Sequence, residues 1–160
     1  MALGDMFLYI EGQKTGKILG ESKDAVYSGQ MHINGWSWGM SSSGSMGGGT
    51  GSAKTALSEI SISKDVDTAS TALMSVMRNN EQIKKGVITV RKAGSKPIDY
   101  FKIIFEKARI TSHTVGSQSG PELTEQLSIA FEKIEVQYCA QDDSGGAKGA
   151  STFTAEVTKL

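Results

Sequence analysis

The chain has 160 residues and a mass of 17.0 kDa, which is the size of one ordinary domain. Its 17 basic and 17 acidic residues give a formal charge of zero, which argues against a protein that coats nucleic acid or an anionic membrane. The apolar runs are a few residues long, far below the ~18 that a membrane helix needs. One cysteine, Cys139, excludes an internal disulfide framework and a zinc site built from several cysteines. The N-terminus has no basic leader segment, so we expect a protein made in the cytoplasm without a cleaved signal peptide.

Alternation of apolar and polar residues predicts strands along most of the chain. In chain order, the predicted strands lie at about 6–10, 31–38, 57–62, 87–90, 98–105, 123–138 and 153–157. Within 123–138 the apolar positions change from odd to even, between Phe131 and Ile134. A change of parity needs an extra residue, so we expect a β-bulge near Glu132 and Lys133.

A single segment has helical rather than strand spacing. Apolar residues at 69, 72, 73, 76 and 77 predict a helix over about 68–79. Asp67 or Thr68 is the expected N-cap, and Asn79-Asn80 the stop. The sequence therefore predicts one mainly β domain over 1–160, a small barrel or sandwich with one α-helix packed outside it.

A glycine- and serine-rich stretch at about 41–53 separates two of the predicted strands. Five of the 19 glycines lie between Gly44 and Gly51, and almost no side chain there can be buried. Such a loop is either a flexible surface segment or an arm that becomes ordered against another molecule. A near match to a phosphate-binding loop, from Gly48 to Thr55, is followed by a predicted strand instead of a helix, which argues against nucleotide binding.

The segment Trp36-Ser37-Trp38 places two indole rings on one face of a predicted strand and Ser37 on the other. The two tryptophans are most simply explained as core anchors. Ser37 then faces solvent, a cavity or a partner.

Catalytic and cofactor motifs are weak throughout the sequence. His32 and His113 belong to no cluster with metal-ligand spacing, and no carboxylate pair or Cys–His pair stands out. We therefore expect neither an enzyme nor a cofactor or metal.

Several segments, in order and spacing, resemble a known family over nearly the whole chain. They are Gly20–Asp24, Trp36–Ser41, Ser43–Ser45 with the glycine run, Lys64–Ser70, Val90–Gly94, Tyr100–Phe105 and Ala130–Val136. Together they are similar to the haemolysin-coregulated protein (Hcp) family of the bacterial type VI secretion system. The run 12–20 is several residues longer than the short connection expected before Gly20–Asp24, so the resemblance predicts the fold but not the conformation of this connection.

The resemblance implies two antiparallel sheets that form a small barrel or sandwich flanked by one helix. It also implies hexameric rings that stack into a tube, which a contractile sheath propels out of the cell behind a VgrG-type spike. The implied partners are thus other copies of the chain, the spike, the sheath and small effector proteins carried in the lumen. The protein would be cytoplasmic before assembly and then secreted without a signal peptide.

Two sets of residues correspond to functional positions of the family. Ser37 matches a position that lines the ring interior, so it is the candidate effector contact. The extended loop that contacts neighbouring subunits or the next ring corresponds to Ser43, Gly44, Ser45, Met46, Gly47, Gly48, Gly49, Thr50 and Gly51. The alternative is a monomeric β-sandwich that binds a ligand such as a carbohydrate on exposed aromatic side chains.

Overall fold

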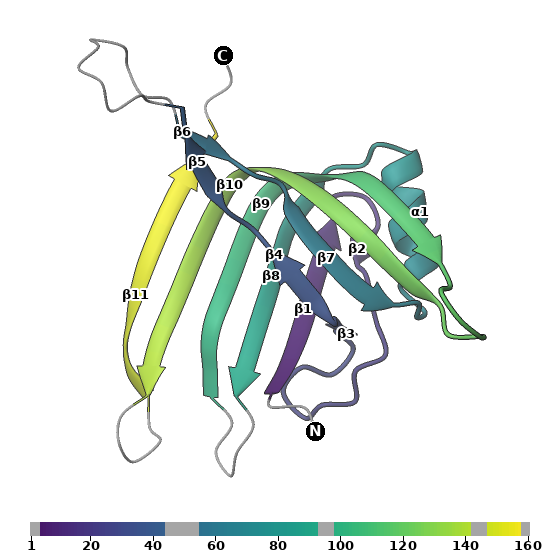
Figure 1. Ribbon diagram of the computed structural model, residues 1–160, viewed down its shortest axis with the longest axis horizontal. Helices are drawn as coiled ribbons and strands as arrows, with labels where there is room; N and C mark the ends of the chain where they lie inside the picture. Colours follow the sequence, from purple (N-terminus) through teal and green to yellow (C-terminus); the bar gives the residue numbers. More distant parts are fainter. Residues whose placement is uncertain (1–3, 44–54, 93–97, 142–146, 158–160) are drawn as a thin grey trace.

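Long antiparallel strands dominate the computed structural model, which describes residues 4–43, 55–92, 98–141 and 147–157 (Figure 1). β1 (Gly4–Gly12), β8 (Ile83–Lys92), β9 (Ile98–Gly116) and β10 (Thr124–Gln141) are neighbours in this order. The shorter strands are β2 (Gly16–Lys17), β3 (Met31–His32), β4 (Gly35–Ser37), β5 (Met40–Ser42), β6 (Thr55–Leu57) and β7 (Ile60–Asp65), with β11 (Ala147–Glu156) last. The large sheet runs β2-β1-β8-β9-β10-β7-β4, with β11 also on β10 and β3 on β1.

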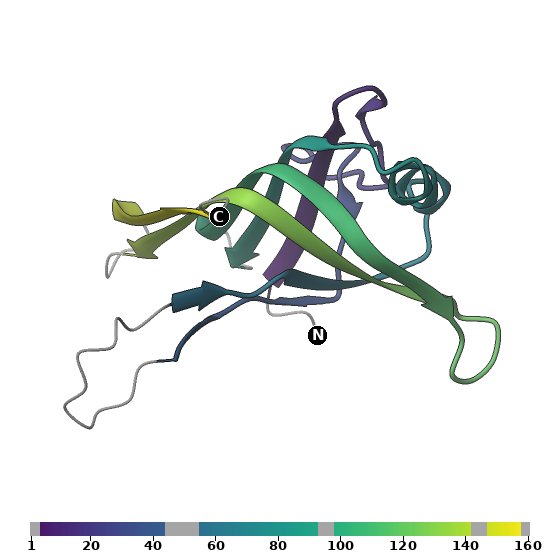
Figure 2. The same cartoon turned by 90° about the horizontal axis from the view of Figure 1, so that it is seen from above.

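Strand β10 belongs to two layers of the molecule. Its first half, Thr124–Ile129, pairs with β7, whereas its second half pairs with β11 from Lys133 onward. β5 and β6 form a separate two-stranded sheet that continues from β4 and β7, and it diverges from β10 and β11 when seen from above (Figure 2). The prediction of a mainly β fold with two antiparallel sheets and one helix is confirmed. Among the described strands no pairing joins β4 back to β2, so the fold is an open sandwich.

Helix α1 (Ser70–Arg78) lies at the end of the molecule away from β11, inside the predicted range of 68–79 (Figure 1). Its N-cap is Ala69, so the prediction of Asp67 or Thr68 in that position is wrong. Asp67 instead accepts a hydrogen bond from the main-chain N–H of Ala69 at 2.9 Å, which fixes the turn before the helix. The helix ends at Arg78 with Asn79 as its C-cap, at the predicted stop, and Asn80 follows in the left-handed region with φ of 53°.

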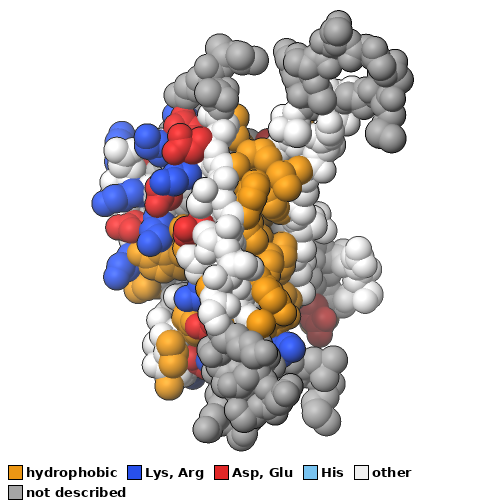
Figure 3. Space-filling view, turned by 90° about the vertical axis from the view of Figure 1, so that its left-hand side faces the viewer, with side chains coloured by type: hydrophobic (Ala, Val, Ile, Leu, Met, Phe, Trp, Pro, Cys, Tyr) orange, Lys and Arg blue, Asp and Glu red, His pale blue; other side chains and the backbone are white. Residues whose placement is uncertain are grey.

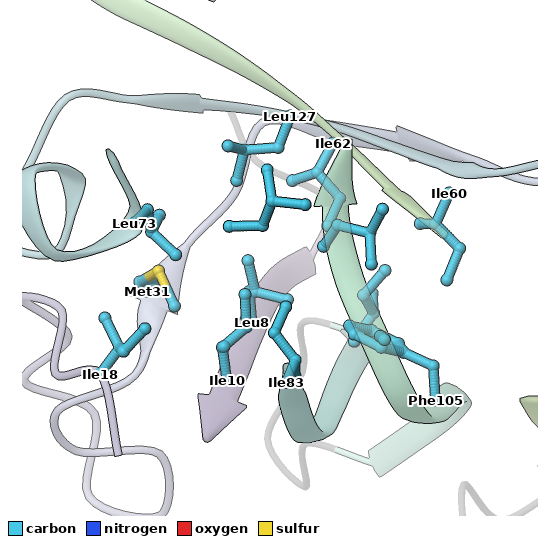
Figure 4. Close-up of a cluster of buried hydrophobic side chains, with 14 of the residues drawn as sticks. Leu8, Ile10, Ile18, Met31, Ile60, Ile62, Leu73, Ile83, Phe105 and Leu127 are labelled. Atoms are coloured by element: carbon cyan, nitrogen blue, oxygen red, sulfur yellow. The ribbon is translucent and has the colours of Figure 1, made fainter. Parts of the chain in front are cut away.

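The apolar core lies between the long strands, β7 and the helix. Leu8 and Ile10 from β1, Phe105 from β9 and Leu73 from α1 are each fully buried in it (Figure 4). Gly86 of β8 faces Phe105, and a Cβ atom placed there would lie 2.1 Å from the ring. The absence of a side chain at Gly86 thus makes room for the aromatic ring of the neighbouring strand.

In β10 the buried positions change from odd to even numbers, as predicted, but no bulge of β10 alone produces this change. Phe131 and Ile134 are both buried, yet the register pairs Phe131 with Ala108 and Lys133 with Glu106 without a slip. Strand β9 changes parity at the same level, where Lys107 has φ of 50°. The register shift between these strands falls instead between Ser128 and Ile129, so the bulge predicted near Glu132 and Lys133 is wrong in place.

A buried ionic cluster joins β7, β9, β10 and the start of α1. Lys64 and Glu125 form an ion pair, and each side chain has 0% exposure. The Lys64 ammonium also donates to Asp67 Oδ1 at 2.9 Å, and Ser70 Oγ donates to Glu125 Oε1 at 2.8 Å. His113 Nε2 lies 2.8 Å from the other oxygen of Glu125. Both oxygens of this buried carboxylate therefore have partners, as buried charges require.

The hydrogen bonds of this cluster keep Glu125 ionised. Burial alone would raise the pKa of Glu125. Hydrogen bonds from Lys64, Ser70 and His113, together with the charge of Lys64, outweigh burial and hold that pKa below its ordinary value.

Some expectations fall outside what the structure tests. No helix among the described residues is long and apolar enough to cross a membrane. Residues 44–54, most of the predicted loop at 41–53, lie outside the described ranges, and the 1–160 domain boundary stays a prediction.

Substitution Gly86→Ala is expected to lower the free energy of unfolding by about 1–3 kcal/mol, because the new methyl group overlaps the buried Phe105 ring. Urea unfolding followed by tryptophan fluorescence measures the change. Gly39→Ala is the control, since a Cβ atom at Gly39 meets nothing within 4 Å. Equal stability of the two variants would contradict the packing argument.

Substitution Glu125→Gln is expected to lower the free energy of unfolding by about 3–5 kcal/mol at pH 7, because it removes the fully buried carboxylate that pairs with Lys64 and leaves only the partly exposed Asp67 to balance the buried charge. Folding lowers the pKa of Glu125, so its contribution is complete above the unfolded-state value of about 4.3 and is lost as the pH falls through the folded-state pKa. Unfolding curves recorded from pH 7 to pH 3 should show this acid-sensitive part in the parent chain and not in the variant. Glu135→Gln, on the same strand, serves as control and should change stability by less than about 0.5 kcal/mol.

Candidate functional site

Ser37 begins a row of four serines that crosses four strands. The register pairs Ser37 of β4 with Ser61 of β7, Ser61 with Ser128 of β10, and Ser128 with Ser112 of β9. Directly opposed residues carry their side chains on the same face of a sheet, so the four hydroxyl groups share one face. Ser37 is exposed, as predicted from its place between the tryptophans.

A second polar row lies beside the serine row. Ser63 of β7 pairs with Gln126 of β10, and Gln126 pairs with Thr114 of β9. The two rows line one shallow groove, and no charged side chain is among its described lining residues. We call this surface, made of Ser37, Ser61, Ser63, Ser112, Thr114, Gln126 and Ser128, the hydroxyl face. It offers neutral hydrogen-bond donors and acceptors.

The hydroxyl face and the buried ionic cluster are opposite sides of the same strands. Lys64 follows Ser63, Glu125 precedes Gln126, and His113 lies between Ser112 and Thr114. Successive side chains of a strand point to opposite faces, so the ionic cluster lies on the inner face and the hydroxyl groups lie on the outer face of the same strands. The cluster thus holds together the strands that carry the hydroxyl groups. The cluster therefore fixes the register on which the hydroxyl face depends.

Both tryptophans pack against the core, as predicted. The Trp36 ring stacks on Phe101 with centroids 5.3 Å apart, and the Trp38 ring lies 6.4 Å from both Phe131 and Phe153. The aromatic side chains of this segment therefore do not form an exposed platform on the face that carries Ser37.

The inner face of β11 carries an apolar strip that the rest of the described chain leaves open. Phe153 is 41% exposed and Tyr138, on the neighbouring β10, is 49% exposed. Figure 3 shows a continuous band of hydrophobic side chains beside this edge of the molecule. We define the apolar strip as Val136 and Tyr138 of β10 and Phe153 and Ala155 of β11, with Trp38 at its base.

The outer edge of β11 is also unpaired. Within the described residues β11 pairs only with β10, and from Gly149 to Ala155 its sequence contains no charged residue and no proline. Natural edge strands are usually protected by such residues, so a long edge without them is suited to pairing with another chain.

Two of the sequence segments that resemble the Hcp family meet in the fold. The Arg91 guanidinium donates to Asp24 from both terminal nitrogens, at 3.1 and 2.7 Å, and to Asp5 at 2.9 Å. Hydrogen bonds from Arg91 and from the main-chain N–H groups of Tyr27 and Val26 hold the pKa of Asp24 far below its usual range. These motif residues clamp the loop before β3 to β8, which is a structural role.

The longer connection at 12–20 forms the hairpin of β1 and β2. Glu81, after the helix, accepts hydrogen bonds from the main-chain N–H groups of Lys14 and Thr15 at 3.1 and 2.9 Å. It also accepts one from the Thr15 hydroxyl at 2.8 Å. The hydrogen bonds from Thr15 and Lys14 lower the pKa of Glu81 despite a smaller opposing effect of burial. The extra residues are thus fastened to the body of the fold.

The remaining predicted site residues are only partly placed. Ser43 is exposed, whereas 44–51 lie outside the described residues, so their role stays a prediction. No group of three His, Cys, Asp or Glu side chains in the described ranges is arranged to hold a metal ion. Sequence reasoning missed Ser61, Ser112 and Ser128, although the alternation of Ile60-Ser61-Ile62-Ser63 was a signal of a strand with one hydroxyl-bearing face.

Known proteins match this chain over most of its length. The family model described as "Type VI secretion system effector, Hcp" matches residues 7–138. Protein hcp1 of Pseudomonas aeruginosa is 33% identical over 149 residues, which cover 91% of this chain and 89% of that protein.

Solved structures share the fold. A structure described as a type six secretion system protein has a TM-score of 0.83 at 20% identity and covers 95% of this chain and 96% of its own. A type VI secretion system effector from Yersinia pestis has a TM-score of 0.76 at 25% identity, covering 96% and 100%. Hcp1 from Salmonella typhimurium has a TM-score of 0.75 at 20% identity, covering 97% and 95%. Because the family model matches most of this sequence and the Pseudomonas relative is 33% identical, the chain belongs to the Hcp family of type VI secretion proteins.

Proposed function

We propose that this chain is the subunit of a type VI secretion inner tube. Six copies close into a ring, the rings stack, and the tube is exported with small effector proteins in its lumen. The observation that carries this proposal is the apolar strip beside the edge of β11, because the described residues leave both features open and a second copy of the chain would cover them.

Ring closure requires a head-to-tail contact, in which one surface of a copy meets a different surface of the next. The edge of β11 supplies unpaired main-chain groups, and the apolar strip supplies area that gains about 25 cal/mol for each Å² removed from water. Formal charge balance over the whole chain suits a subunit whose main partners are copies of itself.

The loop of Ser43 to Gly51 is proposed to contact neighbouring subunits or the next ring. The hairpin of β5 and β6 leads into it and extends away from the core, which places its flanking residues at a boundary of the subunit (Figure 1). The stacked tube would in turn contact a VgrG-type spike and a contractile sheath.

The hydroxyl face is proposed to line the lumen and to contact the effector, with Ser37 at its β4 edge as the candidate contact residue. Its neutral side chains hydrogen-bond to a partner without selecting for one sign of charge, which suits a carrier of different proteins. No step in this function requires catalysis, so we propose a structural and carrier role and not an enzyme.

The first test is oligomeric state. Light scattering after size exclusion, at high micromolar concentration, is expected to give the mass of six chains, and electron micrographs should show rings. Phe153→Glu should weaken assembly at least tenfold, because it puts a charge in a contact that hides a phenylalanine worth about 1.5–3 kcal/mol. Val26→Glu, at a 73% exposed site away from the strip, should assemble like the parent chain.

A parent chain that stays monomeric under these conditions would refute the proposal that the protein is a tube subunit. Equal assembly of Phe153→Glu and Val26→Glu would leave the ring intact and refute the role of the apolar strip.

The second test concerns cargo. Ser37→Glu is expected to reduce at least tenfold the amount of a co-expressed type VI effector that co-purifies with the ring, because a carboxylate in the hydroxyl face must lose water to contact a neutral partner. Ser75→Glu, on the exposed side of α1, is the matched control and should retain the effector. Unchanged retention by rings of the Ser37 variant would exclude Ser37 as a cargo contact.

A further inference from the structure

Six charged residues cross the outer face of the large sheet in one line and alternate in sign. In spatial order from β2 to β11 they are Lys17, Glu11, Lys85, Glu106, Lys133 and Glu156. Each is directly opposite the next in the strand register, so all six side chains lie on the same face. We call this line the charge row.

The charge row faces outward, and within the described residues the only side-chain hydrogen bond made by a row member is the one that Tyr9 donates to Glu11 at 3.2 Å. Ile10, Phe105 and Ile134, which neighbour row members along their strands, point the other way and are fully buried. In Figure 3, Lys, Arg, Asp and Glu side chains gather at the left of the view, on the opposite side of the molecule from the two-stranded sheet of β5 and β6. The ion pairs of the described residues lie elsewhere, around Lys64 and Arg91 and at Asp99–Lys102, and none joins two row members within 4.0 Å.

The two ends of the charge row carry opposite charges at opposite edges of the sheet. Lys17 lies on β2, the first strand in the sheet order, and Glu156 lies near the end of the edge strand β11. Three cations and three anions make the row neutral overall, so a partner with one sign of charge would meet as much repulsion as attraction. A second copy placed head to tail is different, because its Lys17 continues the alternation after Glu156.

We propose that Glu156 of one copy faces Lys17 of the next, so that the charge row sets the direction and register of the contact between subunits. This inference rests on the proposed ring. Such charges act mainly by excluding wrong arrangements. A copy docked in the reverse sense places like charges together, and a shift of one residue puts an uncharged neighbour opposite Lys17 or Glu156 and so loses the attraction. The apolar strip on the inner side of β11 drives association, and the row on the outer side selects its geometry.

Charge reversal at the two ends tests this contact on the full chain. Lys17→Glu and Glu156→Lys are each expected to weaken self-association about tenfold or more, because every contact then pairs two like charges. An equimolar mixture of the two variants should recover rings, since each contact between unlike variants again joins opposite charges. The double variant K17E/E156K should also recover. Mass photometry at 50 and 500 mM NaCl measures all four, and high salt should reduce the differences.

Controls separate this contact from general effects of charge. Lys23→Glu and Glu122→Lys reverse exposed charges outside the row and should assemble like the parent chain. Circular dichroism establishes that each variant is folded. If the parent forms rings and both end variants form them equally well, or if the mixture fails to recover them, the charge row does not make this contact. A parent chain that never forms rings would instead refute the proposed ring itself.

Discussion

The buried pair of Lys64 and Glu125 is the interaction on which the arrangement of this fold depends. It joins directly opposed residues of β7 and β10, and its other partners come from β9 and from the start of α1. A single slip of register would move Lys64 or Glu125 to the outer face and a neutral side chain into the core. An apolar pair would tolerate such errors more easily, which is why we interpret the cluster as a device for register and not for stability alone.

That register has consequences on both sides of the strands. On the inner side it aligns the ionic cluster with the core, and on the outer side it aligns four serines into the row that begins at Ser37. Elsewhere on the large sheet the same regularity aligns charges of alternating sign. The molecule thus presents a neutral polar face, an apolar strip and a balanced charged face, and these differ in the kind of partner each accepts.

Local patterns in the sequence were enough for the strands, for helix α1 and for the inward direction of Trp36 and Trp38. They were not enough for β9 beyond Phe105, because the alternation of buried and exposed side chains is interrupted twice there. The first interruption is at Lys107, and the second is at Thr111, opposite the register shift in β10. Lys64 and Glu125 are 61 residues apart, and only strand order makes them neighbours. The serine row could not be predicted for the same reason, since pairing between strands leaves no trace in the period of either one.

The open edge of β11 also has a consequence for the chain before it finds its partners. An edge that accepts the correct strand of another copy accepts incorrect strands equally well, because main-chain hydrogen bonds do not depend on side-chain identity. Gly149 to Ala155 contains no lysine or proline to discourage this. If the chain assembles as proposed, the newly made subunit would be exposed to aggregation until it meets another copy, and its solubility would depend on how quickly that contact forms.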